Sequence, residues 1–154
     1  MPMTIAILED NDERISAMQC YLADKFPFFE VRFFRAANEA VEWIREHASQ
    51  IICLSLDHDL ECPAGAPDPG CGRDVAELVA GLQPQFPIVI HSTNVHAAIA
   101  MEALLQERGW TVSRVLPYGD LAWLAEIWLP AIRAAIVGSA RQPATTACEA
   151  SPTR

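Results

Sequence analysis

The sequence predicts an α/β fold in which a parallel sheet of five strands is covered by helices on both faces. Short apolar runs and amphipathic stretches alternate five times along the chain. Such alternation is typical of repeated βα units, and right-handed crossovers place the strands of such units side by side in one sheet. At 154 residues, of which 51% are hydrophobic, the chain is long enough to bury one core, and no linker divides it.

The first half of the chain contains three of the expected strands and two helices. Runs rich in β-branched and aromatic residues predict strands over 4–9, 29–34 and 51–56. The amphipathic stretches between them predict helices over 12–25 and 37–48. In the first of these, Ile15, Met18 and Leu22 recur at helical spacing and therefore share one face.

The second half opens with a loop rich in proline and glycine, from Glu61 to Gly72. The elements expected after it are a helix over 73–82, a strand over 87–91, a helix from Asn94 to about 108, a strand over 111–116 and a helix over 119–137. From Gly138 onward the residues are small and polar, with prolines, which predicts disorder. We therefore expect one domain over 1–137 and a disordered tail over 138–154.

Charge and composition exclude several classes of partner. The net charge of −9 argues against an extended nucleic-acid surface, which would be basic, although a short RNA end that carries phosphate remains compatible. No apolar run approaches the ~20 residues that a membrane-spanning helix needs. The N-terminus lacks a basic signal-peptide region, and the five cysteines fit no complete disulfide framework, so we expect a cytoplasmic protein with reduced thiols.

Polar side chains follow three of the expected strands, at the point where each strand ends. They are Glu9 and Asp10 after the first strand, Asp57, His58 and Asp59 after the third, and His91, Ser92 and Asn94 after the fourth. The carboxyl ends of neighbouring parallel strands lie along one edge of the sheet, where ligands bind. A group of carboxylates and imidazoles at this edge suits a divalent cation and a phosphate.

Three carboxylates are the expected metal ligands. Glu9, Asp10 and Asp57 at adjoining strand ends would repel one another unless a cation or bound protons intervened. Mg²⁺ (or Mn²⁺) prefers such oxygen ligands and keeps several waters. The alternative is that Asp10 and Asn11 only cap the helix that follows.

Four residues are expected to carry catalysis: Asp57, His58, Asp59 and His91. Imidazoles titrate near neutrality, which general acid–base chemistry on a phosphoester requires. Asp59 shares the direction of Asp57 if the strand stays extended, as another ligand or as a base for water. The alternatives are a satisfied buried histidine at position 91 and a solvated loop carboxylate at position 59.

Ser92 and Asn94 are the expected phosphate-binding residues. A hydroxyl group and nearby backbone amides can hold phosphate oxygens. Helix capping explains Asn94 equally well. Alternation along the strand also points His91 and Ser92 to opposite sides.

The five-fold pattern resembles a response-regulator receiver domain over nearly all of the chain before Gly138. Glu9 and Asp10 correspond to the acidic pair of receivers. Asp57 corresponds to their phosphoacceptor aspartate and Ser92 to their hydroxyl position. The resemblance implies a three-layer αβα sandwich of the flavodoxin/receiver type, with strand order 2-1-3-4-5.

One position of the receiver pattern is not matched. Receivers place a lysine just before the proline after the fifth strand, and this chain has Leu116 there. Leucine cannot pair with a phosphoryl group. Arg114, two residues earlier on the same face of the strand, is a candidate replacement.

The histidines are additions to the receiver pattern. The sequence Asp57-His58-Asp59-Leu60, together with His91-Ser92 and Asn94, is similar to a divergent group of receivers that process cyclic phosphates. This resemblance implies a metal-dependent phosphoesterase that acts on a small phosphate-bearing substrate or an RNA end. The alternative is a signalling receiver that a histidine kinase phosphorylates on Asp57.

Overall fold

Five parallel strands form one sheet in the computed structural model, which describes residues 2–141 of the chain. The strands are β1 (Thr4–Leu8), β2 (Glu30–Phe34), β3 (Ile51–Leu56), β4 (Ile88–His91) and β5 (Val112–Val115). They pair in the order β2-β1-β3-β4-β5. This arrangement confirms the predicted fold class and strand order. The three central strands are apolar throughout most of their length because helices cover both of their faces.

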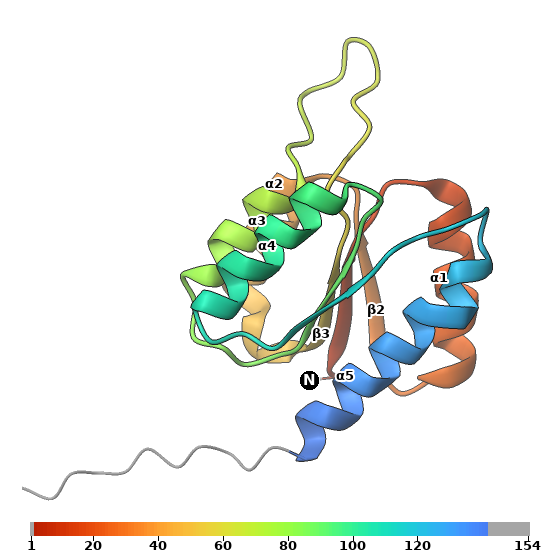
Figure 1. Cartoon of the computed structure of the whole chain (residues 1–154), viewed down its shortest axis with the longest axis vertical. Helices are drawn as coiled ribbons and strands as arrows, with labels where there is room; N and C mark the ends of the chain where they lie inside the picture. Colours follow the sequence, from red (N-terminus) through yellow and green to blue (C-terminus); the bar gives the residue numbers. More distant parts are fainter. Residues whose placement is uncertain (1, 142–154) are drawn as a thin grey trace, which may run out of the picture.

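Helices form a layer on each side of the sheet (Figure 1). One layer contains α1 (Asp12–Lys25) and α5 (Leu129–Arg141), and the other contains α2 (Ala37–His47), α3 (Gly72–Ala80) and α4 (Val95–Glu107). A short 3-10 turn, η1 (Ala48–Gln50), follows α2, and a π-helical turn, η2 (Leu124–Trp128), precedes α5. Helix α5 continues through Gly138, beyond the end at residue 137 that we expected. The rest of the expected tail, residues 142–154, lies outside the described residues.

Alternation along the inner strands divides the core into two clusters. Ile5, Ile7, Cys53 and Val89 pack against α1, η2 and α5. The residues between them, such as Ala6, Leu54 and Ile90, pack against α2, α3 and α4. Continuing the first series by steps of two leads to polar residues at the carboxyl ends of the strands: Glu9, Ser55, Asp57 and His91. The strand pleat therefore directs these four side chains towards the α1/α5 layer.

A long loop, residues 61–71, projects from the same edge of the sheet (Figure 1). Its base is attached to the domain at both ends. The backbone N–H of Glu61 donates to the Asp10 carboxylate. The backbone N–H of Ala37 donates to the carbonyl oxygen of Pro69 at 2.7 Å.

Gly72 follows this loop as the first residue of α3, and it lies against the backbone of Asp57. Its N–H donates to the carbonyl oxygen of His58 at 2.9 Å. A Cβ atom at this position would lie 1.9 Å from the backbone oxygen of Asp57. Only glycine allows α3 to start this close to the end of β3, and this contact fixes the backbone that carries Asp57.

Two further expectations concern membrane spans and thiols. Across residues 2–141, none of the helices combines the length and apolarity needed to cross a membrane. The four cysteines in this part of the chain are free thiols, with Cys53 buried in the core.

Candidate functional site

Glu9, Asp57 and His91 converge where β1, β3 and β4 end. One ligand atom from each residue lies within 4.8 Å of those from the other two. All three side chains are buried. Two carboxylates and one imidazole at this spacing form a donor set that fits a divalent cation. The structure thus brings together three of the residues that the sequence indicated.

Glu9 is held by the start of α1 on one side and by His91 on the other. Its Oε1 accepts the backbone N–H groups of Asp10 and Asn11, each at 3.0 Å. Its Oε2 lies 3.1 Å from Nε2 of His91. Burial alone would raise the pKa of Glu9, but the hydrogen bond and charge of His91, the Asn11 amide and the Arg14 guanidinium lower the pKa below its ordinary value. Glu9 is therefore ionised at neutral pH.

Asp57 has the opposite shift. Burial raises the pKa of Asp57 to about 6, and the neighbouring Glu9 carboxylate acts in the same direction. His91, Arg14 and the backbone N–H of His58, which donates to Oδ1 at 2.7 Å, offset only part of this effect. A cation between the two carboxylates would remove the cost of ionising Asp57.

His91 has a partner at each ring nitrogen. Its Nδ1 lies 2.7 Å from Oγ of Ser55, and the indole N–H of Trp128 donates to the same Oγ at 3.0 Å. Oγ of Ser55 has a second lone pair and its own proton, so it can accept a proton from Nδ1 or donate one to it. The ring also stacks on Trp123, with centroids 6.0 Å apart. Ser55 and Trp128 thus fix the orientation of the imidazole.

Arg14 is the site residue that the sequence did not reveal. Its Nη1 lies 3.6 Å from Oε2 of Glu9 and 3.9 Å from Oδ2 of Asp57. Asn11 caps α1 by accepting the backbone N–H of Arg14 at 3.0 Å, so the arginine stands in the first turn of the helix. A cation is unfavourable there because that end of a helix is already positive. This mismatch was the available signal that Arg14 has partners outside its helix.

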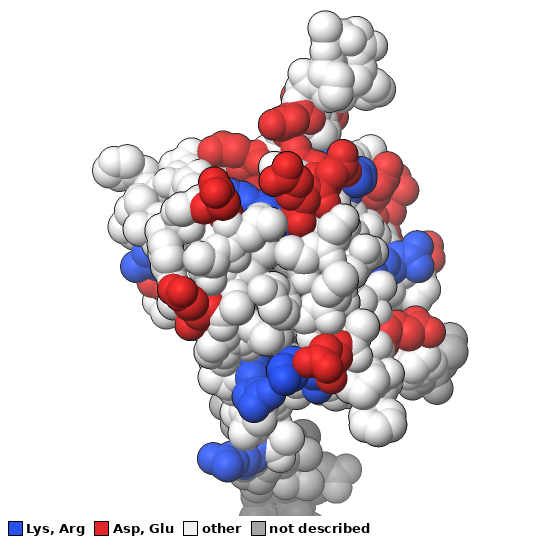
Figure 2. All heavy atoms as spheres, turned by 90° about the vertical axis from the view of Figure 1, so that its right-hand side faces the viewer, with Lys and Arg blue, Asp and Glu red and all other residues white. Residues whose placement is uncertain are grey.

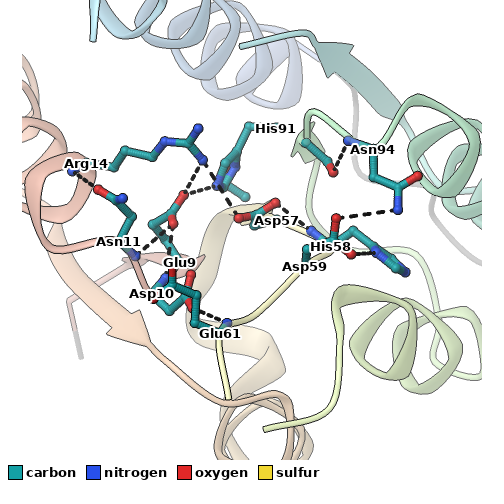
Figure 3. A network of polar contacts seen from close by, with 12 residues as sticks. Glu9, Asp10, Asn11, Arg14, Asp57, His58, Asp59, Glu61, His91 and Asn94 are labelled. Carbon is teal, nitrogen blue, oxygen red and sulfur yellow. Dashed lines mark hydrogen bonds and ion pairs between the residues drawn. The ribbon is translucent and has the colours of Figure 1, made fainter. Parts of the chain in front are cut away.

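Asp10 lies beside the buried cluster and not within it. Its carboxylate accepts the backbone N–H of Glu61 at the base of the long loop (Figure 3). Asn11, and not Asp10, supplies the side-chain cap of α1. Of the three carboxylates expected to hold a metal, the structure thus gathers Glu9 and Asp57, and His91 completes the group.

His58, Asp59 and Asn94 form a second polar group beyond Asp57, on the side away from Arg14 (Figure 3). The Nδ1 atom of His58 lies 2.8 Å from Oδ1 of Asp59. The side-chain amide of Asn94 donates to the other oxygen of Asp59 at 3.4 Å. Asp59 is exposed, whereas the His58 side chain is mostly covered. Asp59 therefore orients the imidazole of His58, whose backbone N–H, and not its ring, contacts Asp57.

Ser92 and Asn94 are joined by a hydrogen bond at the start of α4. The backbone N–H of Asn94 donates to Oγ of Ser92 at 3.1 Å. The Asn94 side chain also caps α4 by accepting the backbone N–H of Ala97 at 3.1 Å. Ser92 lines a hollow between α4 and β5, while His91 faces Glu9. The two neighbours therefore point in different directions, as alternation predicts.

Arg114 and Leu116 line the same hollow as Ser92. The Arg114 guanidinium pairs with Glu102 of α4 at 3.0 Å. Leu116 is 54% exposed. The cation that approaches Glu9 and Asp57 is thus Arg14 from α1, and not Arg114 from β5.

Negative charge surrounds this edge of the molecule. Figure 2 shows acidic side chains gathered around the base of the projecting loop, with basic groups among them. A surface of this kind attracts cations and disfavours polyanions. It fits a metal site better than a nucleic-acid surface.

Comparisons with known proteins agree with this architecture. The family described as "Cyclic-phosphate processing Receiver domain" matches residues 6–107, a range that includes Glu9, Asp57 and His91. Among the curated proteins, none matches the chain.

Solved structures with this fold include several receivers. The phosphorylated cyanobacterial phytochrome response regulator RcpA is 22% identical, with a TM-score of 0.67 over 94% of this chain and 100% of that one. A receiver domain from Rhodospirillum rubrum is 20% identical, with a TM-score of 0.63 over 91% and 96%. The CheX–CheY–BeF3–Mg²⁺ complex from Borrelia burgdorferi is 13% identical, with a TM-score of 0.61 over 85% and 90%. At these identities the likeness shows the fold alone.

Proposed function

Because the chain belongs to the cyclic-phosphate processing receiver family, we propose that it hydrolyses cyclic phosphates at a divalent-metal site at the carboxyl edge of its sheet. The observation that carries this proposal is the convergence of Glu9, Asp57 and His91. A receiver that only accepts a phosphoryl group on an aspartate does not need an imidazole within its acidic cluster. A metal-dependent phosphoesterase does make use of one.

The proposed ligands of the ion are Glu9, Asp57 and His91, with Asp10 at the margin of the site. Carboxylates suit Mg²⁺ and Mn²⁺, and the imidazole favours Mn²⁺ of these two. When bound, such an ion would polarise a phosphoryl oxygen and lower the pKa of a coordinated water.

Of the two histidines, His58 is the better candidate for proton transfer. Its Nδ1 is engaged by Asp59, which leaves Nε2 for the attacking water or the leaving alkoxide. Asn94 in turn contacts Asp59 and limits its rotation. An imidazole oriented by a carboxylate is the usual arrangement of a general base. His91 has no exposed surface, and it would serve as a ligand through Nε2, with its proton on Nδ1 and Ser55 as the acceptor.

Ser92 and Asn94 are the proposed phosphate-binding residues on the opposite side of the site. The Ser92 hydroxyl accepts one backbone N–H and still has its own proton to donate. The start of α4 adds the backbone amides that favour an anion. The substrate would then be a small phosphate-bearing molecule or an RNA end, held locally on an otherwise acidic surface.

A turnover assay tests the proposal. The protein is incubated with 2′,3′-cyclic nucleotides and Mg²⁺ or Mn²⁺, and the products are separated by chromatography. We expect ring opening by the wild type and its loss in Asp57→Asn and His58→Ala. His96→Ala, an exposed histidine on α4, is the matched control and should keep full activity. Absence of turnover with both metals and all four bases would overturn the proposal.

A second function is favoured by the position of Asp57. It follows β3 at the place where receivers accept a phosphoryl group, and a cation lies 3.9 Å from its Oδ2. A histidine kinase would be the partner in that case. Exposure to a small-molecule phosphodonor with Mg²⁺, followed by intact-mass analysis, separates the two functions. A mass increase that disappears in Asp57→Ala would support signalling.

A further inference from the structure

We propose that Arg14 binds the phosphoryl group of the ligand, from the first turn of α1 and not from the end of β5. This inference rests on the proposed function only in that the ligand carries a phosphate. Leu116 at the end of β5 has no charge to offer, and Arg114 is paired with Glu102. Arg14 is the cation that both buried carboxylates approach.

The distances show that Arg14 is near these carboxylates without being hydrogen-bonded to them. Its Nη1 lies 3.6 Å from Glu9 and 3.9 Å from Asp57, beyond the range of a good hydrogen bond. Among residues 2–141, no atom accepts a hydrogen bond from the guanidinium of Arg14. Arginine has five N–H donors in a planar fork that matches phosphate oxygens. Those donors are therefore available to a ligand.

Trp123 holds the guanidinium in place. The charged group lies over the indole ring, 5.2 Å from its centroid, and the ring itself has no exposed surface. His91 stacks on the same ring. One buried side chain thus positions both the cation and the imidazole next to Asp57. The indole N–H of Trp123 is also buried and has no partner among the described residues.

Metal binding would strengthen this role. A divalent cation between Glu9 and Asp57 gives these carboxylates a closer counter-ion than Arg14. The guanidinium is then left beside a site of reduced negative charge, where two parallel N–H groups can hold a phosphoryl oxygen pair. Figure 3 shows Arg14 on one side of Asp57 and the His58–Asp59–Asn94 group on the other.

Phosphate binding, measured by calorimetry, tests the inference. Inorganic phosphate is titrated into the protein saturated with Mg²⁺, and Mg²⁺ is titrated separately into the metal-free protein. The variants are Arg14→Gln and Arg14→Lys, with Arg114→Gln as the matched control because it removes the same charge from the β5 side. Arg14→Met, which keeps the aliphatic stem on Trp123, replaces Arg14→Gln if circular dichroism shows that the latter does not fold.

We expect Arg14→Gln to weaken phosphate binding by roughly ten-fold or more, as loss of a charge-assisted bidentate contact does. Its Mg²⁺ affinity should be unchanged or higher, because a positive charge has been removed. Arg14→Lys should recover part of the phosphate affinity, and Arg114→Gln should retain all of it.

The inference is overturned if Arg14→Gln binds phosphate as well as Arg114→Gln does, or if its main defect is in Mg²⁺ affinity. The turnover assay with cyclic nucleotides separates this failure from that of the proposed function. If Arg14→Gln retains full wild-type turnover, the proposed hydrolase function is supported and the role of Arg14 is not. If phosphate binding depends on Arg14 but the protein shows no turnover, the role of Arg14 is supported and the hydrolase function is not.

Discussion

The Nε2 atom of His91 lies 3.1 Å from Oε2 of Glu9, and neither side chain has any exposed surface. This contact joins β4 to β1 across the end of β3, between residues 82 positions apart in the sequence. A buried pair of this kind contributes little net stability, but breaking it leaves an uncompensated charge in the core. Replacing one member of the pair should therefore lower the free energy of unfolding more than replacing both.

Replacing His91 alone should destabilise the protein. His91→Leu keeps most of the volume but leaves the Glu9 carboxylate buried without its partner, which costs about 3 kcal/mol. The double variant Glu9→Gln/His91→Leu should recover most of this loss. Urea unfolding of metal-free protein at pH 7 measures both, and His96→Ala should change the free energy of unfolding by less than about 0.5 kcal/mol. Equal losses in the single and double variants would contradict a charge-based explanation.

The raised pKa of Asp57 predicts a stability effect that depends on pH. The folded protein binds a proton on Asp57 up to a pKa of about 6, whereas the unfolded chain releases it near 3.8. The stabilisation from this proton is complete below 3.8 and is lost as the pH rises through 6. Asp57→Asn should therefore raise the free energy of unfolding by about 1–3 kcal/mol at pH 8, and have little effect at pH 4, in metal-free buffer.

Thermal unfolding at the two pH values checks this prediction. The control is Asp59→Asn, because Asp59 is exposed and should give no comparable difference. A gain of the same size at pH 4 and pH 8 would show that Asp57 is ionised at both, against the pKa shift.

Ser55 should be needed for both stability and metal binding. Ser55→Ala leaves Nδ1 of His91 and the indole N–H of Trp128 buried without a partner, which costs about 2 kcal/mol. If Nε2 of His91 is a ligand, losing this support should also weaken Mn²⁺ affinity by roughly ten-fold or more. Ser113→Ala, in the exposed part of β5, is the matched control. Normal Mn²⁺ affinity in Ser55→Ala, measured by calorimetry, would argue against His91 as a ligand.

Two glycine-to-alanine changes should have opposite signs. Gly72→Ala forces a Cβ to within 1.9 Å of the Asp57 carbonyl oxygen, so β3 and α3 must separate. We expect a loss of about 2 kcal/mol or more. Gly138→Ala meets no atom within 4 Å and lies inside α5, where alanine should add up to about 1 kcal/mol. Chemical denaturation of both variants measures the difference, and a tolerated Gly72→Ala would show that the start of α3 can shift without cost.

The fold could be predicted because its signals are local. The helix over 12–25 and the strand over 51–56 have the bounds expected from the sequence, since Asn11 gives a clear cap and the strand a continuous apolar run. Where local signals are weak, the prediction was poorer. Gly138 favours a helix end by propensity, but packing of Ile132 and Ile136 against the sheet carries α5 to Arg141.

Only those site residues that stand at strand ends could be predicted from the sequence. The positions of Glu9, Asp57 and His91 follow from parallel strands ending at one edge, together with a pleat of period two. The contacts that Arg14 and Trp128 make with the site could not be predicted, because they depend on how α1 and η2 pack on the sheet. The π-helical turn that brings Trp128 to Ser55 has no sequence signature of its own. The hydrogen bond between Asp10 and the loop could not be predicted from the sequence either.

The hydrogen bond between Asp10 and the backbone of Glu61 joins the base of the projecting loop to the margin of the proposed ion site. An ion that takes Asp10 as a ligand competes with the loop for the same carboxylate. Ion binding then loosens the base of the loop, and by reciprocity any partner that immobilises the loop in its present position lowers ion affinity by the same factor.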